Sequence, residues 1–184
     1  LGGFAKVQPY YARNAEVAAM QDDVRPFIRT YFNSLASLVN REDLSLWEHF
    51  FNGAFNKTHE TGYFLHQTRL MLVQERGDEL WLAPFVTSAW MRDGMKVEVR
   101  RAPTQFGEVS YRLVSRSATG AIEAEIAAPR RTRPSCIVLR LRHPEGRSMR
   151  SVTVNGAPHT DFDPEGESVR IRPGKGTISV VALY

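Results

Sequence analysis

The spacing of apolar residues changes character along this chain of 184 residues. Before about Gly77 the apolar side chains recur every three or four positions, which is the spacing of an amphipathic helix. After Asp93-Gly94 they alternate with polar side chains, as in half-buried strands. We therefore predict an α+β fold, in which an N-terminal helical segment is followed by an antiparallel β-sandwich.

The same change divides the chain into two predicted parts. Residues 1–76 form the helical segment, and residues 77–184 form the sandwich, with a linker over 77–94. Helices are expected over residues 14–21, 23–39 and 59–73, with Thr58 as the N-cap of the third and Gly77 as its C′ residue. One helical turn is expected over 88–91. The expected strands cover 95–101, 107–115, 121–127, 135–142, 151–155, 168–172 and 177–183.

The second predicted helix carries apolar residues on most of its circumference. Phe32 and Ala36 widen the stripe formed by Val24, Phe27, Ile28, Tyr31, Leu35, Leu38 and Val39. Three helices cannot bury such faces on one another. We expect the sandwich or a further segment of chain to cover them.

The net charge of +4 comes from the second part of the chain. Residues 77–184 hold sixteen of the 24 basic and twelve of the 20 acidic residues. The arginines are densest over Pro129–Arg150, where Arg140 and Arg142 alternate with leucines. Because aromatic residues are not interleaved, we predict the solvated face of a strand in preference to a polyanion site. No nucleic-acid partner is expected, and no membrane partner, because no apolar run has the length of a membrane span.

The stretch Trp47–Val73 gathers acids, histidines, a lysine and aromatic residues. Glu60 falls in the first turn of the third predicted helix, where the helix dipole stabilises negative charge. If Glu60 is catalytic, this position suits a general base or nucleophile better than a general acid, whose pKa must be raised. The alternative is that Glu60 only complements the charge of the helix end.

A carbohydrate site is the second hypothesis for this stretch. Trp47, Glu48 and His49 precede two phenylalanines, and aromatic rings stack on sugar faces while carboxylates bind hydroxyl groups. Lys57 and His59 are further candidates for substrate binding. A hydrophobic anchor with exposed polar neighbours explains Trp47, Glu48 and His49 equally well, and a polar turn explains Lys57 better than substrate binding does. Gln67 faces inward on the predicted helix and is expected to satisfy a buried backbone group.

The sequence predicts no metal and no cofactor. His59-Glu60 begins a zinc-protease motif, but the position of its second histidine holds Tyr63. His66 follows His59 by seven residues, with no third ligand at a matching spacing. Cys136 is the single cysteine, so the chain can form no internal disulfide.

Two segments resemble a known family. They are LWEHFFNGAFNKTHETGYFLHQTRLMLV and DELWLAPFVTSAWMRDGMKVEVRRAPTQFGEVSYRL. In this order they resemble the C-terminal end of a large six-hairpin glycoside hydrolase, a class that includes the α-L-rhamnosidase-like and α-L-fucosidase-like enzymes. In that class the last helices of an (α/α)6 barrel lead, through segments like Leu80–Pro84 and a tryptophan like Trp90, into a C-terminal sandwich.

The resemblance implies hydrolysis of a glycosidic bond with inversion, with one carboxylic acid protonating the leaving oxygen and one carboxylate activating water. Glu60 matches the late-barrel carboxylate that acts as base, and Glu48 is the reserve candidate. The partner acid would come from earlier barrel helices. The expected partners are therefore a carbohydrate and the rest of the barrel, and this chain alone is expected to be inactive.

Two other hypotheses stay open: a non-catalytic carbohydrate-binding or structural module, in which Trp47, Trp81 and Trp90 stack or pack, and a module that offers its helices to a partner. The start, LGGFAKVQPYY, has no initiator Met and no signal-peptide pattern, so we expect a fragment or processed piece. The sequence does not decide the compartment. An extracytoplasmic location would suit the parent enzyme that the resemblance implies.

Overall fold

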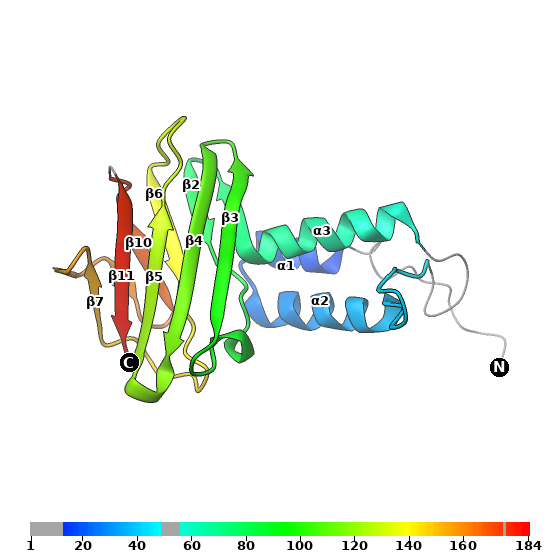
Figure 1. Ribbon diagram of the computed structural model, residues 1–184, viewed down its shortest axis with the longest axis horizontal. Coiled ribbons are helices and arrows are strands. Elements are labelled where there is room, and N and C mark those ends of the chain that lie inside the picture. The colour runs from blue at the N-terminus through cyan, green and yellow to red at the C-terminus, as the bar shows by residue number, and fades with distance from the viewer. Residues whose placement is uncertain (1–12, 49–55, 175) are drawn as a thin grey trace. The chain divides into compact units, whose positions relative to one another are not determined.

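The computed structural model describes residues 13–48, 56–174 and 176–184. Within these ranges the chain begins with three α-helices and continues as two β-sheets (Figure 1). The predicted α+β class, a helical segment followed by a sandwich, is confirmed.

The helices lie close to their predicted positions. They are α1 (Asn14–Met20), α2 (Val24–Leu38) and α3 (Thr58–Leu72). Pro26 lies in the first turn of α2, where a missing N–H costs little. Asp23 occupies the N-cap position of α2 with its side chain making no capping hydrogen bond among the described residues.

One face of α2 packs on α3. Phe27, Tyr31, Ser34 and Leu38 are the buried residues of α2. The Tyr31 ring stacks on Phe64 with centroids 6.1 Å apart, and the Tyr31 hydroxyl lies 2.8 Å from Thr68 Oγ1. Ala36, which was expected to widen the buried stripe, is exposed, so the buried face of α2 is narrower than the sequence suggested.

The prediction that Gly77 is the C′ residue of the third helix is wrong. α3 ends at Leu72, and the next four residues form β1 (Val73–Arg76), which pairs with β2 (Glu79–Leu82). Gly77 lies in the turn between them with φ of 63°, a conformation that glycine adopts without strain. A left-handed glycine is common to helix ends and hairpin turns, which is why the sequence alone favoured the wrong element.

The sandwich contains the remaining elements. They are η1 (Ser88–Met91), β3 (Lys96–Thr104), β4 (Gly107–Arg116), η2 (Ser117–Thr119), β5 (Ala121–Ala127), β6 (Cys136–Arg140), β7 (Ser151–Val154), β8 (Ala157–His159), β9 (Phe162–Asp163), β10 (Ser168–Ile171) and β11 (Thr177–Leu183). The seven predicted strands and the turn over 88–91 are present. The strands β1, β2, β8 and β9 were not among the predicted strands.

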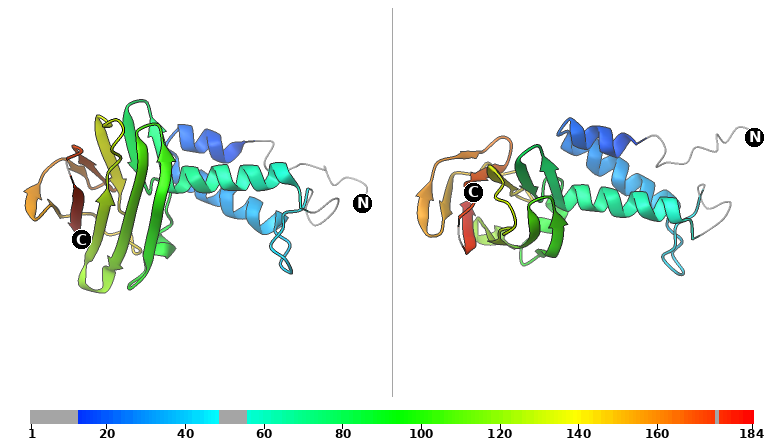
Figure 2. Two further views of the ribbon diagram at one scale, coloured as in Figure 1. Left: turned by 45° about the horizontal axis from the view of Figure 1, so that its top comes forward. Right: turned by 90° about the horizontal axis from the view of Figure 1, so that it is seen from above.

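The described strands form two sheets, which face each other (Figure 2). One has the order β1-β2-β6-β10-β9 and the other β3-β4-β5-β11-β7-β8. Neighbouring strands are antiparallel except β2 and β6, which are parallel with Leu80 opposite Ile137. The predicted sandwich is therefore antiparallel with one parallel pair.

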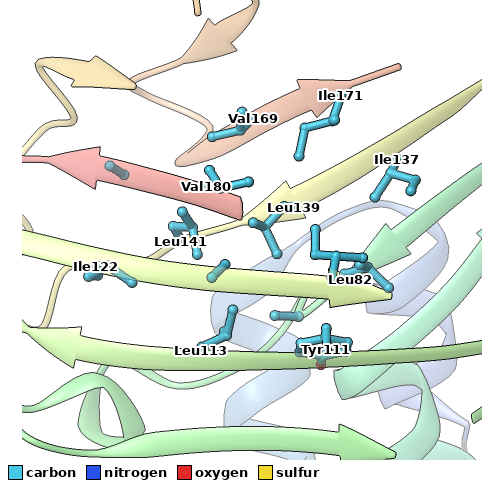
Figure 3. Packing of buried hydrophobic residues seen from close by; sticks show 14 of the residues in the cluster. Leu82, Tyr111, Leu113, Ile122, Ile137, Leu139, Leu141, Val169, Ile171 and Val180 are labelled. Atoms are coloured by element: carbon cyan, nitrogen blue, oxygen red, sulfur yellow. The ribbon is translucent and has the colours of Figure 1, made fainter. Parts of the chain in front are cut away.

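The core lies between the sheets. Alternate residues of facing strands point inward, among them Tyr111 and Leu113 of β4, Ile122 of β5 and Leu139 of β6 (Figure 3). Leu80, Leu82 and Met91 belong to this core although they lie in the predicted linker, 77–94. That segment is thus part of the sandwich. The chain divides into two compact units at residues 70 and 71, six residues before the predicted boundary.

Candidate functional site

A row of polar and aromatic side chains follows one face of α3. Glu60 and Gln67 are each 1% exposed, and Tyr63 and Phe64 between them are half-buried. Positions i, i+3, i+4 and i+7 share a helix face, so the sequence predicted this alignment correctly. Two fully buried polar side chains on one helix are unusual, since burying a polar group is unfavourable unless it is hydrogen-bonded.

Glu60 is a buried carboxyl group beside a histidine. Its Oε1 lies 2.7 Å from His59 Nε2, while the His59 side chain itself is 37% exposed. Within the described residues no group other than the backbone N–H of Glu60 itself acts as a hydrogen-bond donor to this carboxyl group. The carboxyl group is therefore desolvated without the full set of bonds that would stabilise its charged form.

The pKa of Glu60 differs in direction from the prediction. Burial raises the pKa of this carboxyl and Glu48 adds to the rise, while its own backbone N–H, His59 and Lys57 act against it. The expectation that the helix end keeps Glu60 ionised did not include this burial. A raised pKa suits a group that holds a proton and donates it.

A second carboxylate lies near Glu60. Glu48 forms an ion pair of 3.2 Å with Lys57, and both side chains are partly exposed. The backbone N–H of Lys57 donates to Leu46 O at 3.4 Å, which holds the segment before α3 against the segment after α2. The structure thus brings four predicted site residues together at the start of α3: Glu48, Lys57, His59 and Glu60.

The other predicted site residues are less closely defined. Trp47 is half-buried, and its backbone N–H donates to Leu38 O at 2.8 Å, at the end of α2. No described contact places its ring beside Glu60. His49 lies outside the described residues.

Residues of α1 extend the polar row, and the sequence did not indicate them. Gln67 Nε2 donates to Glu16 Oε2 at 3.2 Å, so its partner is a side chain and not the backbone group that was expected. Arg13 Nη2 donates to the Tyr63 hydroxyl at 3.1 Å. A seven-residue helix carries too little periodicity to show which of its residues face α3.

Trp81 and Trp90, the other predicted stacking residues, belong to the sandwich. The Arg76 guanidinium lies 3.8 Å from the centre of the Trp81 ring, and Trp81 Nε1 donates to Glu79 Oε2 at 3.0 Å. Trp90 packs against the hydrophobic core. Both tryptophans therefore have packing roles, and a cation covers one face of Trp81.

Two further kinds of feature, a cluster of metal ligands and a membrane-crossing helix, are absent from the described ranges. No three side chains of His, Cys, Asp or Glu gather there as metal ligands. None of the helices in those ranges combines the length and the apolar content of a membrane-crossing helix.

Comparisons with known proteins give likenesses to solved structures, but none to a protein family or a curated sequence. A solved structure described as "Glycoside hydrolase" matches over 94% of this chain with 12% sequence identity and a TM-score of 0.45. The chain spans 29% of the length of that protein. A likeness of this degree carries no argument about function.

Proposed function

We propose that this chain is the C-terminal portion of a glycoside hydrolase, in which α1–α3 are the last helices of an (α/α)6 barrel and the sandwich is an accessory domain. The observation that carries the proposal is Glu60, a carboxyl group 1% exposed and 2.7 Å from His59, beside the Glu48–Lys57 ion pair. Buried acids with perturbed pKa values concentrate at catalytic sites.

Glu60 is assigned the proton-transfer role in this proposal. Inverting glycosidases protonate the leaving oxygen with one carboxylic acid and activate water with a second carboxylate about 6.5–9.5 Å away. The raised pKa of Glu60 supports the acid role, in place of the base role that the resemblance implied. The second carboxylate would come from elsewhere in the barrel, with Glu48 as the reserve candidate.

Apolar side chains exposed on the helices support the proposal that a further part of a barrel packs against them. Val17 and Met20 of α1 are 48% and 88% exposed, and Leu65 of α3 is 60% exposed. In this proposal these exposed apolar side chains belong to a surface that the rest of the barrel covers. A complete barrel, from the same parent chain or another subunit, would supply that cover. Residues of that barrel would determine which sugar and which linkage the enzyme accepts.

The test is Glu60→Gln in the full product of the reading frame that contains this chain. With aryl glycosides of poor leaving groups, kcat is expected to fall by about 10²–10⁴-fold, the contribution of a general acid or base. Glu42→Gln, at an exposed glutamate in a turn, is the matched control and should leave kcat unchanged. Unaltered kcat in Glu60→Gln would refute the catalytic role.

The leaving group separates the two roles. A substrate with a nitrophenolate leaving group needs no protonation, so it should restore the rate of Glu60→Gln if Glu60 is the acid. Azide should restore it if Glu60 is the base, because the anion replaces the activated water.

A further inference from the structure

A pocket of the sandwich is lined by two arginine side chains and by the backbone of two glycines. Its volume is about 350 Å³, and it lies between the connection from β5 to β6 and the start of β11. The residues that line it are Ala127–Pro129, Arg130, Arg133, Gly174, Gly176 and Thr177. The pocket belongs to the second compact unit, whereas Glu60 belongs to the first.

The arginine-bearing connection is held in place by the two turns beside it. Arg131 N and Thr132 N donate to Phe106 O at 3.2 and 3.0 Å, and Ser135 N donates to Asp78 O at 2.9 Å. Gly107 allows this close approach, because a Cβ there would lie 3.2 Å from Arg131 Cβ. The connection is thus fixed before any ligand binds, which lowers the entropy lost on binding.

The two pocket arginines differ from other arginines of the sandwich. Arg101 pairs with Glu108 and Arg116 with Glu123, so their charges are locally balanced. Arg130 and Arg133 are exposed, and the described part of the chain offers neither of them an ion pair or a hydrogen bond. No acidic side chain is among the described residues that line the pocket.

We propose that this pocket binds a compact oxyanion: a carboxylate, sulfate or phosphate group. The planar guanidinium fork matches two oxygens of such a group. The described residues that line the pocket include no aromatic ring, so they offer a nucleobase or a sugar ring no surface to stack on. A pocket of about 350 Å³ holds more than one small anion, which leaves room for the molecule that carries the group. This inference does not depend on Glu60.

The test is calorimetric titration of the 184-residue chain with sodium sulfate, phosphate and acetate at low ionic strength, with chloride as the reference anion. Saturable binding is expected for the oxyanions and not for chloride. Arg130→Gln/Arg133→Gln should weaken it by about tenfold per arginine, the loss of one charge-assisted contact each. Arg92→Gln/Arg147→Gln removes the same charge elsewhere on the sandwich and should change affinity by less than about twofold, through screened long-range attraction.

Two results would overturn the proposal. One is the absence of saturable oxyanion binding. The other is an equal loss of oxyanion affinity in both double variants, which would show that binding depends only on the net charge of the protein. If the glutamine variant does not fold, Arg130→Lys/Arg133→Lys keeps the charge and removes the fork, so reduced affinity is again expected.

Comparing free anions with the same anionic groups carried on a larger molecule shows whether the natural ligand of the pocket is a free ion or part of such a molecule. A uronic-acid or sulfated oligosaccharide that binds more tightly than acetate or sulfate, with the excess lost in Arg130→Gln/Arg133→Gln, identifies a saccharide as the carrier. Equal affinities identify the free ion as the ligand. Both results support an oxyanion pocket, and neither bears on the catalytic role of Glu60.

Discussion

Glu60 and His143 are both buried titratable side chains, and burial shifts their pKa values in opposite directions. The neutral form of each is favoured, so the pKa of Glu60 rises and that of His143 falls. His143 is 1% exposed, its ring lies 4.9 Å from the ring of Tyr184, and its Nδ1 accepts the backbone N–H of Glu145 at 3.1 Å.

His143 should make the protein less stable in mild acid. Its folded pKa lies below the ordinary value of 6.5, so the unfolded chain binds the proton more readily. The stabilisation is complete above pH 6.5 and is lost as the pH falls below it, by at most about 1.4 kcal/mol per pH unit for one group. Urea unfolding between pH 7.5 and 5 measures this slope.

Variants isolate the contribution of His143. The slope should be smaller in His143→Gln than in the wild type and unchanged in His66→Gln, at an exposed histidine of α3. Glu60 has a raised pKa, so its contribution to stability falls as the pH rises above its ordinary pKa of 4.5. This contribution is the same in the wild type and both variants and does not affect the comparison. Identical slopes in the wild type and His143→Gln would contradict the prediction.

At the residue scale, the sequence predicted the inward face of α3 because helical spacing alone determines it. It did not predict Glu16 as the partner of Gln67, since that pair depends on how α1 packs. It also did not predict the burial of Glu60 or the direction of its pKa shift, because the N-terminal position in a helix carries no information on solvent access.

At the scale of elements, the close approach of the β5–β6 connection to the β3–β4 turn depends on Gly107. Its φ is 113°, and an added Cβ would lie 3.2 Å from both Cβ and N of Arg131. Gly94 also has positive φ, at 74°, but an added Cβ would meet nothing within 4 Å. An alanine at Gly94 therefore tests backbone strain alone, whereas an alanine at Gly107 tests strain together with steric contact.

Gly107→Ala should cost more stability than Gly94→Ala. We expect a loss of about 2–3 kcal/mol for Gly107→Ala, from strain plus contact, and about 1–2 kcal/mol for Gly94→Ala, from strain alone. The midpoints of urea unfolding measure both. Equal losses would mean that the connection moves away from the turn without cost.

Elements with long, regular periods were the ones predicted correctly. The helical spacing of α2 and α3 and the alternation in β4, β5 and β11 fixed their type. β8 and β9 are three and two residues long, too short for a period to show. β1 was missed because it follows α3 directly, with no glycine or proline between them.

At the scale of the whole molecule, the described residues of the two compact units differ in how many apolar side chains they bury, with more in the sandwich than in the helical unit. The sandwich has a continuous core that runs from Val73 to Tyr184, while a described cluster of the helical unit has Leu38 and Leu46 at its centre. Local stability follows buried apolar area. The helical unit should therefore open more readily than the sandwich.

Hydrogen exchange measures this difference. We expect amides of α2 to exchange about 10-fold or more faster than those of β4, β5 and β11, which corresponds to at least about 1.4 kcal/mol in opening free energy. Equal protection in both units would show that they unfold together. Slower exchange in α2 when a longer parent chain is used would support the missing barrel.

The order of strands also has a consequence for biosynthesis. β11 lies between β5 and β7, and β2 lies beside β6, more than fifty residues later in the chain. A chain leaving the ribosome from its N-terminus can form α1–α3 early, but the six-stranded sheet remains in two pieces until residues 177–183 emerge. During that interval β5 and β7 present unpaired edges, which chaperones and neighbouring nascent chains can bind.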